Sequence, residues 1–158
     1  MRQYSIFVIL LVFSCSLIVA QTTDEIKERN ERIRKRWNRS LVSDSTYTFN
    51  KEVNNLLKQT TEAINPGKAL CVAMGQGRNA LYLARNNWEV SGFDLADEAV
   101  AFAMAQAEKE QLTLNTEIAS FYDYDFGAEK WDLITWLYGG CLDGDFAAKI
   151  TAALKPGG

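Results

Sequence analysis

The chain has 158 residues, 47% of them hydrophobic and 23% charged, which fits one globular domain. Its net charge of −3 becomes −4 without the first twenty residues, since 16 basic residues then face 20 acidic ones, and this argues against a nucleic-acid partner. Histidine is absent, which excludes histidine-based catalysis, and three cysteines without CxxC spacing indicate neither a metal site nor a disulfide framework.

Residues 1–20 contain one arginine followed by an apolar run from Ser5 to Ala20, a pattern typical of a cleaved signal peptide. An uncleaved anchor is the alternative, because seven Lys or Arg residues lie between Lys27 and Arg39 and basic residues favour the cytoplasmic side. The sequence therefore predicts either an exported protein, periplasmic or secreted, or a protein tethered to the membrane through residues 5–20 with a cytoplasmic domain.

Two further regions follow the leader. Residues 21–48 alternate Glu, Lys and Arg with few apolar residues, which predicts an exposed, charged helical linker without chemistry of its own. Residues 49–158 form the predicted domain. It opens with a helix whose apolar stripe precedes the break at Pro66-Gly67 and consists of Val53, Leu56, Leu57, Thr60 and Ile64.

Residues 69–94 have the pattern of a strand, a glycine turn, a helix and a second strand. The apolar run 69–74 is typical of a strand buried on both faces, and Gly75 and Gly77 follow it where the chain must turn sharply. The helix over 79–86 then directs its free N–H groups into the turn. The strand over 90–94 ends on Asp94, which is placed to accept hydrogen bonds from a ribose. The pattern predicts a nucleotide-cofactor site.

The remaining elements continue the alternation. A helix after Asp94 carries one apolar face, which consists of Val100, Ala103, Met104 and Ala107. Strands are predicted over 116–120 and 131–138, followed by a helix over 146–154. Strands that alternate with helices predict an α/β fold, a partial doubly wound Rossmann-like parallel sheet with helices on both faces.

In these residues the chain resembles the class I S-adenosylmethionine-dependent methyltransferases of the small single-domain type. The segments that carry the resemblance stand in order and in spacing: Pro66–Leu70, Met74–Asn79, Trp88–Asp94, Lys130–Ile134 and Leu154–Gly158. The resemblance implies the strand order 3-2-1-4, S-adenosylmethionine as the cofactor and methyl transfer to an unidentified acceptor, which is a small molecule or another compound. It implies no metal.

The resemblance also implies roles for particular residues. Gly75 and Gly77 would let the backbone approach the cofactor, Arg78 would meet its methionine carboxylate, and Asp94 would hold its ribose. The other cofactor-binding residues implied are Ala73, Leu95, Ser120 and Phe121.

The chain departs from the family pattern at three positions. Cys71 replaces the acid usual near the end of the first strand, Ala73 replaces the first glycine of the motif, and Ser120 replaces the acid expected near the adenine. Asp123 and Asp125 are nearby acids, but their spacing is not that of the family, so the backbone around Phe121 is expected to hold the adenine edge instead. The departures predict weakened cofactor affinity.

The chain stops at Gly158, where the family normally enters a fifth strand, so we expect an incomplete gene product that keeps the cofactor-binding half. No catalytic residue is assigned. Two other functions stay open: a nicotinamide-dependent oxidoreductase, because Gly75, Gly77, Ala80 and Asp94 also satisfy the dinucleotide pattern, and a non-catalytic exported remnant.

Overall fold

A computed structural model describes residues 23–43, 50–139 and 144–158 of the chain. The chain forms two compact units, Met1–Ile33 and Arg34–Gly158. Residues 23–38 are helical, and a short π-helix, η1 (Arg39–Ser43), follows them. The predicted leader lies outside the described residues, and among those that are described no helix is long and apolar enough to cross a membrane. The predicted domain boundaries after residues 20 and 48 stay predictions.

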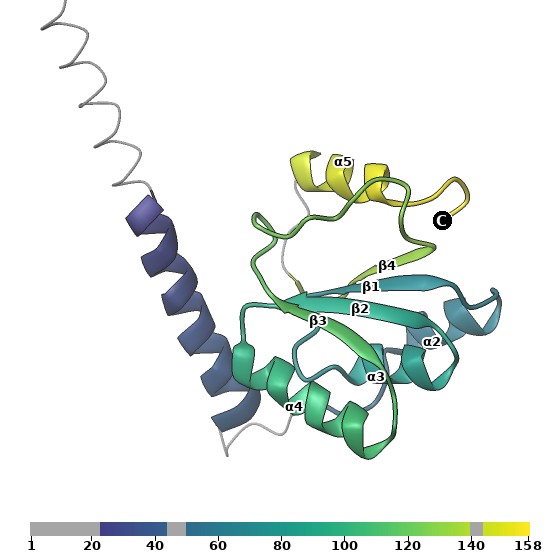
Figure 1. Ribbon diagram of the computed structural model, residues 1–158, viewed down its shortest axis with the longest axis horizontal. Coiled ribbons are helices and arrows are strands. Elements are labelled where there is room, and N and C mark those ends of the chain that lie inside the picture. Colours follow the sequence, from purple (N-terminus) through teal and green to yellow (C-terminus); the bar gives the residue numbers. More distant parts are fainter. Residues whose placement is uncertain (1–22, 44–49, 140–143) are drawn as a thin grey trace, which may run out of the picture. The chain divides into compact units, whose positions relative to one another are not determined.

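Four parallel strands form one sheet in the second unit (Figure 1). The strands are β1 (Lys68–Val72), β2 (Glu89–Asp94), β3 (Leu114–Ile118) and β4 (Leu133–Trp136). Their order is β3-β2-β1-β4, and every neighbouring pair is parallel. The predicted fold class and strand order are therefore confirmed. In this order the carboxyl ends of β1 and β2 lie side by side at the centre of the sheet, where ligands bind in such folds.

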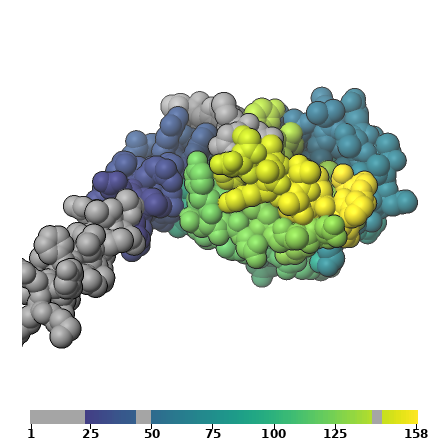
Figure 2. Space-filling model, turned by 90° about the horizontal axis from the view of Figure 1, so that it is seen from above, coloured from purple at the N-terminus to yellow at the C-terminus, as the bar shows by residue number. Residues whose placement is uncertain are grey.

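Helices cover both faces of the sheet. On one face lie α2 (Asn55–Glu62), α3 (Arg78–Arg85) and α4 (Asp97–Lys109), whose buried residues pack on Ala69, Cys71 and Val90. On the other face lies α5 (Gly144–Ala153), which packs through Phe146 and Ala153 on Leu70 and Val72 (Figure 1). Figure 2 shows α5 and the C-terminal segment lying across this second face. Alternate residues of β1 thus enter two different cores, which explains its unbroken apolar run.

The edge strands differ from their predicted ranges. β3 begins at Leu114, two residues before the predicted start, because Leu114 is buried and pairs with Val90 of β2. β4 covers only Leu133–Trp136 of the predicted 131–138, since Trp131 instead forms an isolated bridge with Leu154. Tertiary pairing, which local sequence does not encode, decides both boundaries.

Four predicted core contacts are wrong. Leu56 and Ile64 of the first apolar stripe are 69% and 45% exposed and Thr60 is exposed as well, whereas Leu57 is buried as expected. Met104 of α4 is 39% exposed, because the helix instead buries Ala99 together with Val100, Ala103 and Ala107. The buried face of α4 is rotated from the one that periodicity selects, because its alanines permit close packing on the sheet. In α2 the buried residues are Leu57 and Thr61.

Asp132, from the Lys130–Ile134 segment, joins the starts of β1 and β4 to the chain after α5. Its Oδ2 accepts the Lys68 N–H at 2.7 Å, and its two oxygens accept from Lys155 Nζ at 2.8 and 2.7 Å. The ammonium group of Lys155 and the Lys68 N–H lower the pKa of the Asp132 carboxyl below its ordinary value of 3.8.

We expect Asp132→Asn to lower the free energy of unfolding at pH 7 by up to about 1 kcal/mol, since the pair is partly exposed to solvent. Because the folded-state pKa is depressed, this stabilisation is present above pH 3.8 and is lost as the pH falls through the folded-state value. Urea unfolding at pH 7 and pH 3 tests this. The matched control is Glu89→Gln, which removes only the exposed Lys68–Glu89 pair and should change little. An equal loss at both pH values in Asp132→Asn would contradict the assignment.

Candidate cofactor site

The turn between β1 and α3 has an unusual backbone. Ala73, Gly75 and Gly77 all have positive φ, at 52°, 53° and 77°. Glycine adopts this left-handed conformation without cost, whereas a residue with a Cβ loses about 1–2 kcal/mol there. Ala73, which stands where the family has a glycine, therefore adds strain to the turn.

Gly77 and Gly75 differ in what surrounds them. A Cβ on Gly77 would lie 2.6 Å from the Cβ of Ala103, so the turn packs directly on α4. A Cβ on Gly75 would meet only Leu41 Cδ1 at 3.5 Å. Gly77 is thus required for packing and conformation together, and Gly75 mainly for conformation.

Asp94 is hydrogen-bonded to this turn. Its Oδ2 accepts the Gly75 N–H at 2.8 Å, and its Oδ1 accepts the Ala96 N–H at 2.8 Å. Burial raises the pKa of the Asp94 carboxyl, while the N–H groups of Ala96, Gly75 and Leu95 act in the opposite direction. A carboxylate has about four acceptor positions, so these bonds orient Asp94 and leave it able to accept from a ligand hydroxyl.

Ser120 and Phe121 lie just beyond β3, the strand beside β2. The Ala119 N–H donates to the Asp94 carbonyl at 3.2 Å, which holds the end of β3 against that of β2. Ser120 is buried, and its hydroxyl donates to the Asp123 carboxylate. The Phe121 ring stacks on Trp136 with centroids 4.6 Å apart. The Asp123 carboxylate therefore lies next to Ser120, the position at which the family pattern has an acid.

Arg78, the first residue of α3, contacts two other segments. Its Nη1 donates to the Asn50 carbonyl at 3.0 Å, and its guanidinium carbon lies 5.4 Å from the ring centroid of Tyr138. Three aromatic residues lie within the predicted strand 131–138. Trp131 is buried and Trp136 stacks on Phe121, but Tyr138 is 80% exposed and therefore does not belong to the core.

Sequence analysis missed the contacts of residues 34–43, which it assigned to a linker without chemistry. Asn38 is buried; its Nδ2 donates to Asp97 Oδ1 at 2.7 Å, and its Oδ1 accepts the Glu98 N–H at 3.2 Å. Arg34 pairs with Asp97 at 2.8 Å. The side-chain amide of Gln76 donates to the Leu41 carbonyl, beside Gly75. The sequence offers no signal for this contact, because Asn30 is an uncharged amide within the same charged run as Asn38.

Cys71 replaces the family's acid with a buried, neutral group. Burial raises the pKa of its thiol to about 11, despite a hydrogen bond with Thr135. Cys71 is free, and Cys141 lies outside the described residues. Among residues 23–43, 50–139 and 144–158, no cluster of His, Cys, Asp and Glu could hold a metal ion.

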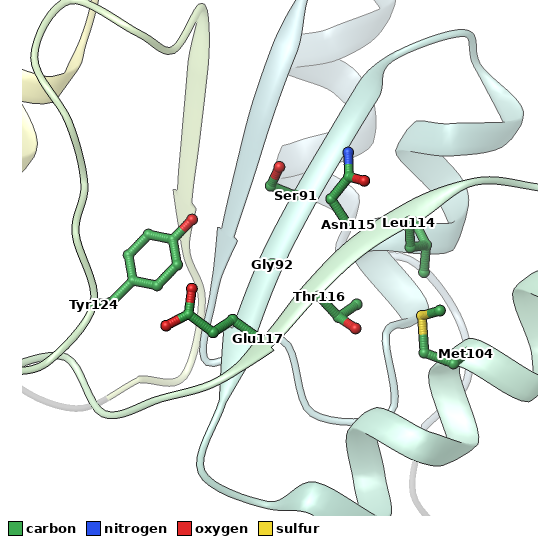
Figure 3. Close-up of a pocket in the computed structure, with 8 residues that line it drawn as sticks. All are labelled: Ser91, Gly92, Met104, Leu114, Asn115, Thr116, Glu117 and Tyr124. Atoms are coloured by element: carbon green, nitrogen blue, oxygen red, sulfur yellow. The ribbon is translucent and has the colours of Figure 1, made fainter.

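A separate shallow hollow of about 420 Å³ lies along β3 (Figure 3). In Figure 3 Glu117 extends toward Tyr124, whereas Thr116 and Met104 lie together on the other side of the strand. Burial and then the charges of Glu117 and Asp125 raise the pKa of Tyr124. None of the predicted site residues lines this hollow, so it is distinct from the turn that Asp94 holds.

Comparison with known proteins identifies the class. Residues 69–158 match the methyltransferase-domain family. A Haemophilus influenzae protein described as a probable S-adenosyl-L-methionine-dependent methyltransferase, TehB, is 36% identical over 75 residues, which cover 45% of this chain and 24% of that protein. Hemagglutinin 1 of Eikenella corrodens is 30% identical over 113 residues, covering 66% of this chain and 36% of its own length. A structure reported for the conversion of a disulfide bond into a thioacetal group in echinomycin biosynthesis is 25% identical; the match covers 66% of this chain and 47% of that one, with a TM-score of 0.57.

The chain belongs to the methyltransferase-domain family. The predicted methyltransferase family and its enzyme class are confirmed. The relative TehB is described as dependent on S-adenosyl-L-methionine, the predicted cofactor. The chain spans only about a quarter to a third of the length of the two curated relatives, at 24% and 36%.

The two turn glycines should differ when each is replaced by alanine. Gly75→Ala is expected to cost about 1–2 kcal/mol of unfolding free energy for its left-handed backbone. Gly77→Ala should cost about 2–5 kcal/mol, because the overlap with Ala103 adds a packing penalty. The control is Gly144→Ala, where an added Cβ meets no atom of the described residues within 4 Å. Thermal or urea unfolding measures all three, and an equal cost at Gly75 and Gly77 would contradict the packing role.

Proposed function

We propose that this chain binds S-adenosylmethionine at the β1–α3 turn and acts in methyl transfer to an acceptor that is still unidentified. The observation that carries the proposal is the hydrogen bond from the Gly75 N–H to Asp94. It places a partly buried carboxylate, suited to a ribose, directly beside a left-handed turn that lets a ligand approach the backbone. Family membership supports the same assignment.

The residues present fit this cofactor. Asp94 would accept the ribose hydroxyls, with Leu95 beside it. Ser120 and Phe121, held against Asp94 through the Ala119 N–H, would border the adenine. The methionine part would lie over the remaining site residues, Ala73, Gly75, Gly77 and Arg78, at the N-terminus of α3.

The affinity for S-adenosylmethionine is expected to be lower than that of a chain that keeps both acids of the family pattern. The neutral thiol of Cys71 offers no carboxylate near the turn. At the adenine side Asp123 supplies the carboxylate from three residues away, and its bond to Ser120 already uses one oxygen. Each charge-assisted hydrogen bond lost is worth about 1.5–3 kcal/mol, which corresponds to about a tenfold or greater loss of affinity.

The bound cofactor would supply a methyl group on a positively charged sulfur, ready for attack by a nucleophile. The chain's own residues would contribute orientation, the main requirement for a direct transfer in line with the leaving sulfur. No residue is assigned as a general base. The net charge of −3 favours a small-molecule or other non-nucleic-acid acceptor.

Neutralising Asp94 tests the proposal. We expect Asp94→Asn to weaken binding of S-adenosylhomocysteine, the demethylated product, by about tenfold or more in calorimetry, since the ribose hydroxyls would lose a charged acceptor. Asp132→Asn, on the opposite end of the sheet, is the control and should bind as the wild type does. If the wild-type chain binds neither S-adenosylmethionine nor its product at millimolar ligand, the proposed function is wrong.

We propose further that residues 1–20 direct export or anchor the chain in a membrane, with residues 5–20 as the tether; the support is sequence alone. Cell fractionation followed by N-terminal sequencing tests this. A cleaved chain outside the cytoplasm indicates export, and an intact chain in the membrane fraction indicates an anchor. An intact chain in the cytosol would refute both.

A further inference from the structure

Tyr138 combines two features that packing does not explain. Its ring is 80% exposed, and its backbone φ is 65°. A bulky residue in the left-handed region is a strained outlier, and such outliers persist where the surrounding structure or function requires them. An exposed ring gains little from burial, so core packing does not offset the strain.

The fold brings Tyr138 to the cofactor turn. Val72, the last residue of β1, pairs with Trp136, the last residue of β4. Tyr138 follows β4 by two residues, and the turn follows β1 directly, so the two segments leave the same edge of the sheet side by side. The ring of Tyr138 faces the guanidinium of Arg78, 5.4 Å away.

An aromatic partner suits an arginine that is to bind a carboxylate. A cation–π contact uses the flat face of the guanidinium, and the N–H donors point outward in its plane. Tyr138 therefore restricts the position of Arg78 through the face of the guanidinium, and the Asn50 carbonyl orients Nη1 from another side.

We propose that Tyr138 is a positioning residue that holds Arg78 in place. With Arg78 held in this way, the site binds nucleosides that carry the methionine carboxylate more tightly than thioether nucleosides that lack it. This inference rests on the proposed function. It assigns to Tyr138 a contribution to cofactor selectivity and none to the stability of the fold.

Two ligands separate that contribution from general effects on the site. S-adenosylhomocysteine carries the amino-acid part, whereas 5′-methylthioadenosine has the same adenine and ribose without it. Tyr138→Gly removes the ring and relieves the backbone strain, and Tyr138→Phe keeps the ring. We measure the affinity of the full chain for both ligands by calorimetry, together with its melting temperature.

We expect Tyr138→Gly to melt at the same or a higher temperature and to bind S-adenosylhomocysteine about two- to fivefold more weakly, in line with an exposed cation–π contact. Its affinity for 5′-methylthioadenosine should be unchanged, and Tyr138→Phe should bind both ligands like the wild type. In a cycle with Arg78→Met, Tyr138→Gly should cause no further loss, since the ring would act only through Arg78.

Other outcomes overturn the inference. If Tyr138→Gly binds S-adenosylhomocysteine as the wild type does, or loses both ligands equally, Tyr138 does not act on the carboxylate. A lower melting temperature with unchanged ligand selectivity would assign it a structural role. If the wild type binds neither ligand, the proposed function fails and the inference fails with it. If the wild type binds both ligands and Tyr138→Gly changes neither affinity, the inference alone is refuted.

Discussion

The hydrogen bond between the Gly75 N–H and Asp94 is the interaction on which the site depends. It joins the turn after β1 to the end of β2 at 2.8 Å and fixes the direction of a carboxylate that burial would otherwise disfavour. The bond requires the left-handed Gly75, and the turn in turn requires Gly77 to pack against α4. Backbone conformation, helix packing and the ribose acid thus form one unit.

Residues 34–43 complete one wall of that unit. Through Asn38 and Arg34 they are held to the first turn of α4, the helix against which Gly77 packs. Leu41 then lies beside Gly75 and accepts a hydrogen bond from Gln76. The segment therefore packs against the turn proposed to bind the cofactor, although its composition is that of a solvated linker.

Sequence reasoning succeeded where one local rule acts. Local stereochemistry predicts the buried run of β1, the glycines of a left-handed turn and the acid at the end of β2. The alternation of strands with helices then implies a parallel sheet. It failed where tertiary packing decides. The exposure of Leu56, the burial of Asn38 and the contact between Tyr138 and Arg78 all depend on partners distant in the sequence. Ala73 shows both sides: its departure from the family was visible, but its cost depends on a φ of 52° that only the structure provides.

The most direct measurement of the central claim is a crystal structure of the chain with S-adenosylhomocysteine. The account predicts the ribose hydroxyls within hydrogen-bond distance of Asp94 while the Gly75 N–H remains bonded to the same carboxylate. A ligand bound elsewhere, for example in the hollow along β3, or an Asp94 carboxylate turned away from the ribose, would contradict it.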